Sequence, residues 1–357
     1  MMHRHTPKRI LVLGSGPLAQ TLVPQLAALP GVTSVRQQSQ FMVGQTLPTA
    51  DLCVELLEGL TVAYEATLQA FAQGMSVVTG SPILAATHGP LLQRAARGQG
   101  AYWAVAAHGL ANLPATLHAM QASRAVWLPA SAAQQVVARM VARQETPEMA
   151  TRQLQLRGAD LTDLHGKQTQ LQAHALLGAW QGVWAEPARQ PRLGPDGLHP
   201  SMLPVLNALG LRVAYGAVVG ATGIQTGPLA LPSQVALPGT EEHTLLATTP
   251  HGELRVALPA GGARAVAVLA AAQAYLAGQR HEAMGPLPAQ AAGPMAQLVL
   301  ASQPVAGLTP LAQHAAHGWW GGVVSLTGPQ EWPVGAVVLP VPAAYRPPAS
   351  QVLRLVG

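Results

Sequence analysis

Residues 9–19 read RILVLGSGPLA, an apolar run that ends in a glycine-rich turn. The run has the length of a buried strand, and residues 17–29 after the turn have apolar positions at helical spacing. Residues 32–36, VTSVR, then read as a second strand. This order predicts a β-α-β unit in which the glycine turn joins the first strand to the helix.

The glycine turn fits the pattern G-x-G-x-x-A, with Gly14, Gly16 and Ala19 at the fixed positions. The first glycine permits a tight turn, the second lets a pyrophosphate approach the backbone, and a small third residue lets the helix pack closely on the strand. The amino terminus of the helix adds free N–H donors. The pattern predicts a dinucleotide site that includes Gly14, Gly16, Pro17 and Leu18; a tight turn with a purely structural role is the alternative.

The end of the second strand indicates which dinucleotide is bound. An acid at this place reads the ribose 2'-hydroxyl of NAD, whereas an arginine can accept the 2'-phosphate of NADP. Arg36 is followed by Gln37, and no acid occurs before Asp51. The sequence therefore favours NADP over NAD; a solvent-facing arginine at a strand end is the alternative.

Strand-like and helical segments continue to alternate up to residue 107. The strand-like segments are 50–59, 75–80 and 101–107, and the helical segments are 61–74 and 90–100. Strands separated by helices of this length are typical of a parallel sheet with right-handed crossovers. The sequence predicts an α/β fold with a Rossmann-type, doubly wound parallel sheet over residues 1–125.

A different pattern begins near Ser123. Helical segments at 131–144 and 147–158 are followed by strand-like segments at 211–220, 243–249 and 253–259. This order predicts an α+β substrate and dimerisation domain over residues 126–282. The alanine-rich segment 261–278 reads as a helix, which we expect to return to the first domain.

The last part of the chain, residues 283–357, predicts a small α+β unit. Proline and glycine in 282–294 mark a linker, and a strand, a loop, a helix that ends at Gly318 and further strands follow. This order is similar to that of an ACT regulatory module; a plain α+β appendage is the alternative.

Composition excludes several classes of protein. The formal net charge is +5, but the arginines are scattered and lysine is nearly absent, which argues against nucleic-acid binding. No apolar run reaches the roughly 18 residues of a membrane span, and the first apolar run is too short for a signal peptide. The single cysteine, Cys53, and thirteen histidines without a ligand motif predict no disulfide and no metal. We expect a cytoplasmic protein with small-molecule partners.

Beyond the glycine turn, residues 9–280 resemble the homoserine dehydrogenase family. Residues 50–89, ADLCVELLEGLTVAYEATLQAFAQGMSVVTGSPILAATHG, are similar to the family's V-E-L-x-G-G and V-V-T-A-N-K-A-L-L-A-x-H-G pattern, and residues 251–268 are similar to its G-E-L-x-x-x-G-x-G-A-G-G signature. The resemblance implies NAD(P)-dependent reduction of aspartate semialdehyde to homoserine in amino-acid biosynthesis, by a homodimer. It also implies cofactor contacts at Leu56, Gly59, Thr79 and Gly261.

The catalytic positions of the family are substituted. Residues 163–182 match the family's helix without a gap, which puts Gln168 at its aspartate and Gln172 at its lysine, while Pro82 stands at the lysine of T-A-N-K. Glutamine has neither a charge nor a useful proton, although the oxygen that receives charge in the reaction needs a cation or an acid. The resemblance therefore implies altered or lost activity; a non-catalytic nucleotide- or metabolite-binding protein is the alternative.

One further residue and one loop bear on catalysis. His108 falls where the family's backbone approaches the nicotinamide, so it is a candidate proton donor; a histidine that only hydrogen-bonds at a strand end is the alternative. Ala130–Gln134 stand at the family's N-G-T-T-N loop. We expect His174 to be a surface residue of its helix.

Overall fold

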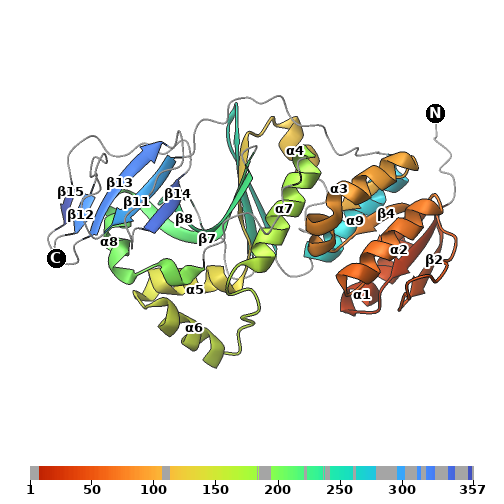
Figure 1. Ribbon diagram of the computed structural model, residues 1–357, viewed down its shortest axis with the longest axis horizontal. Helices are drawn as coiled ribbons and strands as arrows, with labels where there is room; N and C mark the ends of the chain where they lie inside the picture. Colours follow the sequence, from red (N-terminus) through yellow and green to blue (C-terminus); the bar gives the residue numbers. More distant parts are fainter. Residues whose placement is uncertain are drawn as a thin grey trace.

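The computed structural model forms three five-stranded sheets within the residues it describes (Figure 1). A parallel sheet lies at one end of the elongated molecule, a second sheet in the middle and a third at the other end. The described residues are 8–106, 113–182, 184, 194–220, 223–235, 237, 242–259, 263–278, 296–301, 312–314, 319–325, 337–341 and 353–355.

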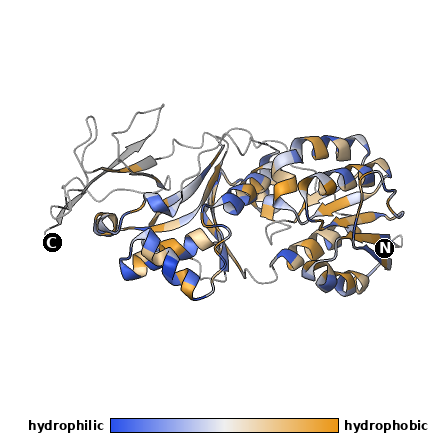
Figure 2. Cartoon of the chain, turned by 60° about the horizontal axis from the view of Figure 1, so that its bottom comes forward, coloured by the Kyte–Doolittle hydropathy of each residue, from blue (hydrophilic) through white to orange (hydrophobic). Residues whose placement is uncertain are grey.

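The first sheet is parallel throughout, in the order β2-β1-β3-β4-β5. Ile10 and Val12 of β1 lie in one hydrophobic core, and Leu11 and Leu13 lie in another. Because side chains alternate along a strand, both faces of this sheet are covered, and Figure 2 shows its strands mostly in the hydrophobic colours. The predicted doubly wound parallel sheet is confirmed. Its strands are β1 (Lys8–Leu13), β2 (Val32–Gln38), β3 (Leu52–Glu55), β4 (Ser76–Thr79) and β5 (Trp103–Val105).

Helices cover the two faces of the parallel sheet. One face carries α1 (Pro17–Ala27) and α9 (Ala263–Leu276), and the other carries α2 (Leu60–Ala72) and α3 (Pro82–Gly98). Since α1 follows β1 and α2 follows the neighbouring β3, the two crossovers leave the sheet on opposite sides. Open α/β sheets bind their ligands outside the carboxyl ends of the strands at such a switch point.

The helix predicted from residue 90 begins earlier than expected, at Pro82. Ser81 caps it by accepting the N–H of Leu84 on Oγ at 3.3 Å, and proline suits the first helical position because the N–H it lacks has no partner there. Pro90, which marked the predicted start, lies inside the helix. The predicted start was wrong because the serine–proline pair at 81–82 was the stronger start signal.

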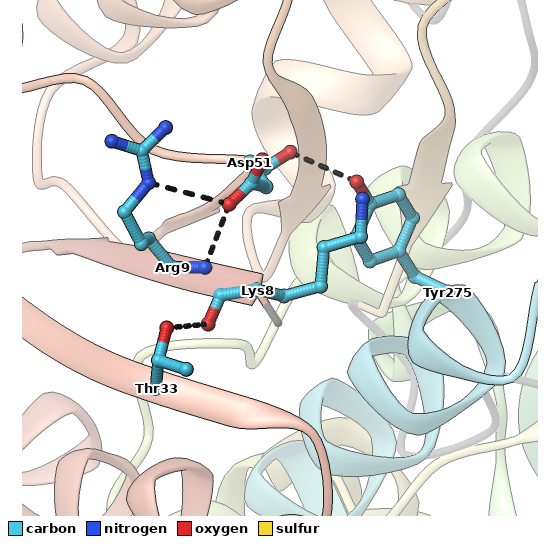
Figure 3. A network of polar contacts seen from close by, with 5 residues as sticks. All are labelled: Lys8, Arg9, Thr33, Asp51 and Tyr275. Carbon is cyan, nitrogen blue, oxygen red and sulfur yellow. Dashed lines mark hydrogen bonds and ion pairs between the residues drawn. The ribbon is translucent and has the colours of Figure 1, made fainter. Parts of the chain in front are cut away.

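Both ends of α9 are fastened to the parallel sheet. At its start, Arg264 donates from Nε and Nη2 to the carbonyl oxygen of Gly80, at 2.8 and 2.5 Å. Near its end, Tyr275 donates its hydroxyl to the carbonyl of Asp51 at 3.1 Å, and the Asp51 carboxylate accepts the N–H of Arg9 at 2.7 Å (Figure 3). Gly80 follows β4 whereas Asp51 precedes β3. The amino terminus of α9 therefore faces the carboxyl edge of the sheet, where a ligand is expected.

The second sheet is antiparallel, in the order β10-β9-β6-β7-β8. Helices α4 (Leu113–Ala119) and α7 (Lys167–Gln181) pack on one face, around Trp127 and Trp180. Two of its strands, β6 and β8, were not predicted from the sequence, and the boundary expected at residue 125 falls within β6. The strands are β6 (Arg124–Leu128), β7 (Leu211–Gly220), β8 (Gly223–Pro232), β9 (Glu242–Thr249) and β10 (Gly252–Pro259).

A tryptophan fills the space between α7 and the first unit. Trp184 stacks on Trp103 of β5 with ring centroids 5.8 Å apart, and its Nε1 donates to Gln93 of α3 at 3.1 Å. A Cβ added at Gly89 of α3 or Gly178 of α7 would lie 2.2 Å from its ring. These two glycines allow α3 and α7 to enclose the tryptophan, which holds α7 against the parallel-sheet unit.

The third sheet has the order β14-β11-β13-β12-β15. It shares a hydrophobic core with β7 and the helices α5 (Ala132–Arg143) and α8 (Leu203–Ala208), while α6 (Pro147–Leu156) packs beside α5. The sequence predicted a helix that ends at Gly318. This prediction was wrong for Ala312–His314, because these residues form β12 and pair with β13. The ACT-like interpretation stays a prediction. The strands are β11 (Ala296–Ala301), β12, β13 (Trp319–Ser325), β14 (Val337–Val341) and β15 (Leu353–Leu355).

Within the described residues, no helix is both long and apolar enough to span a membrane.

Candidate functional site

The turn after β1 requires a glycine at its first position. Gly14 has φ +128°, and a Cβ there would lie 2.8 Å from the carbonyl oxygen of Leu56, in the turn after β3. The Gly14 N–H donates to the carbonyl of Gln38 at 2.9 Å, and Leu56 N–H donates to the carbonyl of Leu13 at 2.9 Å. The turns that follow β1, β2 and β3 are thus locked together at the switch point of the sheet.

Gly16, in contrast, is not required by the backbone. Its φ of −65° is accessible to any residue, and a Cβ there would meet no atom within 4 Å. No side chain caps α1 and its first turn contains no acid. Because Pro17 lacks an N–H, the unpaired amides of this first turn belong to Leu18 and Ala19. Open space in front of uncapped amides fits an anion such as a pyrophosphate.

A second uncapped helix start lies next to the first. Gly59 precedes α2 with φ +96°, its side-chain position is open, and α2 likewise has no side-chain cap and no acid in its first turn. Leu56 is half-buried in the same turn and packs on the core under α1 and α9. Two helix amino termini therefore lie on either side of the switch point.

A buried carboxyl group supports this edge of the sheet. Glu55, at the end of β3, accepts the N–H of Leu57 on Oε1 at 2.7 Å and the hydroxyl of Thr79 on Oε2 at 2.5 Å. Thr79 in turn accepts the N–H of Ser81 at 3.0 Å. Burial raises the pKa of Glu55, and the two hydrogen bonds and Arg264 oppose this only in part. The hydroxyl of Thr79, a predicted cofactor contact, is thus committed to Glu55 beneath the site.

The raised pKa of Glu55 predicts a pH-dependent stability. The unfolded carboxyl releases its proton near its ordinary pKa of 4.5, while the folded one retains it to higher pH. The free energy of unfolding should therefore fall as pH rises from about 4.5 to the raised pKa, by about 1.4 kcal/mol for each unit between the two. In Glu55→Gln this fall should be absent. Urea unfolding of both proteins from pH 4.5 to 8 measures it, and identical pH profiles would contradict the assignment.

Arg36 lies in β2 opposite Leu11, two positions before the strand ends at Gln38. Its side chain is exposed. The residue that reaches the glycine turn is Gln37, which donates its side-chain amide to the carbonyl of Gly14 at 2.9 Å. Gln37 was not predicted as a site residue, because a neutral amide at this position fits neither of the two signals expected for NAD and NADP.

Gln168 and Gln172 lie one helical turn apart near the start of α7. Gln168 is exposed, and its backbone N–H donates to the carboxylate of Asp163 at 2.7 Å. Gln172 is half-buried, and its Oε1 accepts Trp127 Nε1–H at 3.0 Å. Pro82 is the first residue of α3 and offers no polar side chain. None of these three positions carries a charge.

His243 on β9 was not singled out from the sequence. Its Nδ1 accepts the N–H of Ala130 at 2.9 Å, and its ring centroid lies 5.3 Å from that of Trp127. Burial lowers its pKa, which favours the neutral ring. The segment that holds Ala130 leads into α5, where Ser131 accepts the N–H of Gln134. The sequence indicated His243 only as a histidine at the start of an apolar strand, which is a weak signal for a functional residue.

Comparison with known proteins identifies this architecture. No protein-family model matches the chain. A crystal structure of a homoserine dehydrogenase from Thiobacillus denitrificans superimposes with a TM-score of 0.70 at 18% identity, covering 94% of this chain and 98% of that one. A homoserine dehydrogenase of S. aureus gives a TM-score of 0.70 at 14% identity, over 95% and 100% of the two chains.

The chain has the homoserine dehydrogenase fold. A hyperthermophilic archaeal homoserine dehydrogenase in complex with NADPH also matches, with a TM-score of 0.58 at 17% identity, over 79% of this chain and 100% of that one. In sequence, a homoserine dehydrogenase of Pseudomonas aeruginosa is 37% identical over 84 residues. That match spans 23% of this chain and 19% of the curated relative, so the likeness rests on the fold.

Two residues predicted to lie at the site of this homoserine dehydrogenase fold, His108 and Gly261, are outside the described residues. His174, expected on the surface, is 2% exposed, so that prediction was wrong: α7 is enclosed by the second sheet and by α3. No group of residues suited to a metal ion occurs in the described part of the chain.

Proposed function

We propose that this chain is a homoserine dehydrogenase-like oxidoreductase that binds NAD(P) at the carboxyl edge of its parallel sheet. The observation that carries the proposal is the pair of glycines at the switch point. Gly14 is needed to bring the turns after β1 and β3 together, whereas Gly16 leaves open space in front of the uncapped amides of α1. Backbone geometry alone explains the first glycine, but an approaching phosphate explains the second.

The cofactor residues follow from this position. Amides of Gly16, Leu18 and Ala19 would hold the pyrophosphate, with the Leu56 and Gly59 turn on its other side. Gly261 precedes the amino terminus of α9, which faces the same edge. We favour NADP, since Arg36 is exposed on β2 and no acid stands at the strand end.

The proposed reaction is the interconversion of aspartate semialdehyde and homoserine, in amino-acid biosynthesis. When bound, the nicotinamide supplies or accepts the hydride. The protein must then stabilise charge on the substrate oxygen and move a proton. Of the residues at the family positions, Gln168 and Gln172 can donate only uncharged hydrogen bonds and Pro82 can donate none, so His108 is the candidate proton donor. Loss of one general acid costs about 10²- to 10⁴-fold in rate. We therefore propose altered or reduced turnover.

The second candidate is a non-catalytic protein that binds a nucleotide or metabolite. The hydrogen bond from Trp127 to Gln172 supports it, because the amide at the lysine position is integrated into the second unit rather than left as a gap. In either case we propose small-molecule partners, a homodimer formed through the second unit, and a cytoplasmic location.

The decisive experiment is a titration with NADPH and NADH, followed by aspartate semialdehyde. We expect NADPH to bind more tightly than NADH and to be oxidised slowly or not at all when the aldehyde is added. Slow oxidation supports the altered enzyme, and binding without oxidation supports the binding protein. Failure of both nucleotides to bind would contradict the proposed function.

A further inference from the structure

We propose that His243 and Gln172 form a pair of uncharged hydrogen-bond donors that binds a carboxylate or carbonyl oxygen of the small-molecule ligand. The inference rests on the proposed function. It goes further by assigning a ligand contact to His243, on a strand far from α7 in the sequence.

The two side chains meet at one tryptophan. Trp127 of β6 pairs with Leu245 of β9, and His243 lies two residues before Leu245, so both point to the same face of the second sheet. That face carries α7. Gln172 of α7 accepts the Trp127 N–H at 3.0 Å, and the His243 ring packs 5.3 Å from the Trp127 ring. The indole thus positions one donor from α7 and one from β9.

Hydrogen bonds fix the orientation of both donors. Indole N–H can only donate, so the group of Gln172 that faces Trp127 is its oxygen and the amide NH₂ points away. A backbone N–H can also only donate, so His243 Nδ1, which faces Ala130, carries no proton and Nε2 of the neutral ring carries it. Within the described residues, neither the Gln172 amide nitrogen nor His243 Nε2 has an acceptor.

These two free donors define the ligand chemistry. Both groups can donate but carry no charge, so they suit an oxygen that only accepts, such as a carboxylate, a carbonyl or an alkoxide. Under the proposed function, Gln172 stands at the family's lysine position, so the substrate would make this contact. Two neutral donors can stabilise charge on an oxygen without supplying a full positive charge. Such a pair fits binding better than rapid proton transfer.

The test measures L-homoserine binding to the NADP⁺-saturated protein, using His243→Asn and His243→Gln. In His243→Asn the side-chain oxygen can still accept the Ala130 N–H, but the Nε2 donor is lost; in His243→Gln a donor at the Nε2 distance is retained. We expect the asparagine variant to bind L-homoserine about tenfold or more weakly and the glutamine variant to recover most of the affinity. His251→Asn, at an exposed turn on the same hairpin, is the matched control and should bind normally.

A double-mutant cycle with Gln172→Leu tests the pair. We expect the combined loss to be smaller than the sum of the single losses, because one oxygen is shared. Repeating the titration with 3-aminopropan-1-ol, which lacks the carboxylate, shows which oxygen of the ligand is bound. If His243→Asn binds this compound as tightly as wild type does, the pair binds the carboxylate of L-homoserine. If His243→Asn still binds it more weakly, the pair binds the other oxygen. If NADP⁺ binds and L-homoserine affinity is equal in all variants, or undetectable in wild type, the donor pair is overturned while the nucleotide site stands.

Discussion

Placing aspartate at 168 and lysine at 172 and 82 is expected to raise the rate of NADPH oxidation by aspartate semialdehyde about 10²-fold or more over the wild-type rate. The triple variant, P82K/Q168D/Q172K, places charge on α7 and at the start of α3, where the family pattern has it. A lysine can place a full positive charge beside the developing alkoxide and supply a proton, whereas glutamine can donate only an uncharged hydrogen bond. A steady-state assay at saturating NADPH measures the rate.

The matched control reverses the two charges on α7 and leaves the rest of the triple variant unchanged. P82K/Q168K/Q172D has the same composition, and we expect it to stay near the wild-type rate, because the cation now stands one turn from its family position. Lysine at 172 also removes the Gln172 oxygen that accepts the Trp127 N–H, so the free energy of unfolding should fall in the triple variant. If NADPH binds and both variants remain as slow as wild type, the α7 positions do not reach the reacting carbonyl.

The parts of the fold that the sequence predicted correctly are those with short-range signals. The apolar runs that form β1, β3 and β4 are buried on both faces, and such runs separated by helices indicate a parallel sheet. β8 was missed because Gly227, Pro228 and Pro232 read as turn residues. It is a strand because β7 pairs with it along its whole length, and that partner cannot be read from the local sequence.

The candidate site likewise has one part that short-range sequence signals predict and one part that depends on contacts between distant segments. Gly14 and Gly16 belong to one turn, so their spacing alone predicted their position. The contact of Gln172 with Trp127, and of Trp127 with His243, joins three elements that are far apart in the chain. The family resemblance indicated that Gln172 replaces a lysine, but only the structure shows which groups surround the amide. The family pattern therefore pointed to Gln172 from the sequence alone, but not to Trp127 and His243, which lie beside it only in the folded chain.

Gly16→Asp should have opposite effects on stability and on nucleotide binding. Gly16 is the N-cap residue of α1, its backbone conformation suits any residue, and its side-chain space is open. Aspartate is among the best N-cap residues, so we expect the free energy of unfolding to stay level or rise by up to about 1 kcal/mol. A carboxylate beside the proposed pyrophosphate should weaken NADPH binding about 10²-fold or more, because like charges at about 4 Å near a protein surface repel by several kcal/mol.

Two companion variants separate the physical causes of that loss. Gly16→Asn has nearly the same shape and the same capping ability without the charge, so its affinity for NADPH should lie between those of wild type and Gly16→Asp. Gly14→Ala should instead lower the free energy of unfolding by about 1–3 kcal/mol, since a Cβ there combines a positive φ with a contact of 2.8 Å to the Leu56 carbonyl. Calorimetric titration and urea unfolding measure both quantities for each protein. Normal NADPH affinity in a stable Gly16→Asp protein would show that the nucleotide does not lie at the amino terminus of α1.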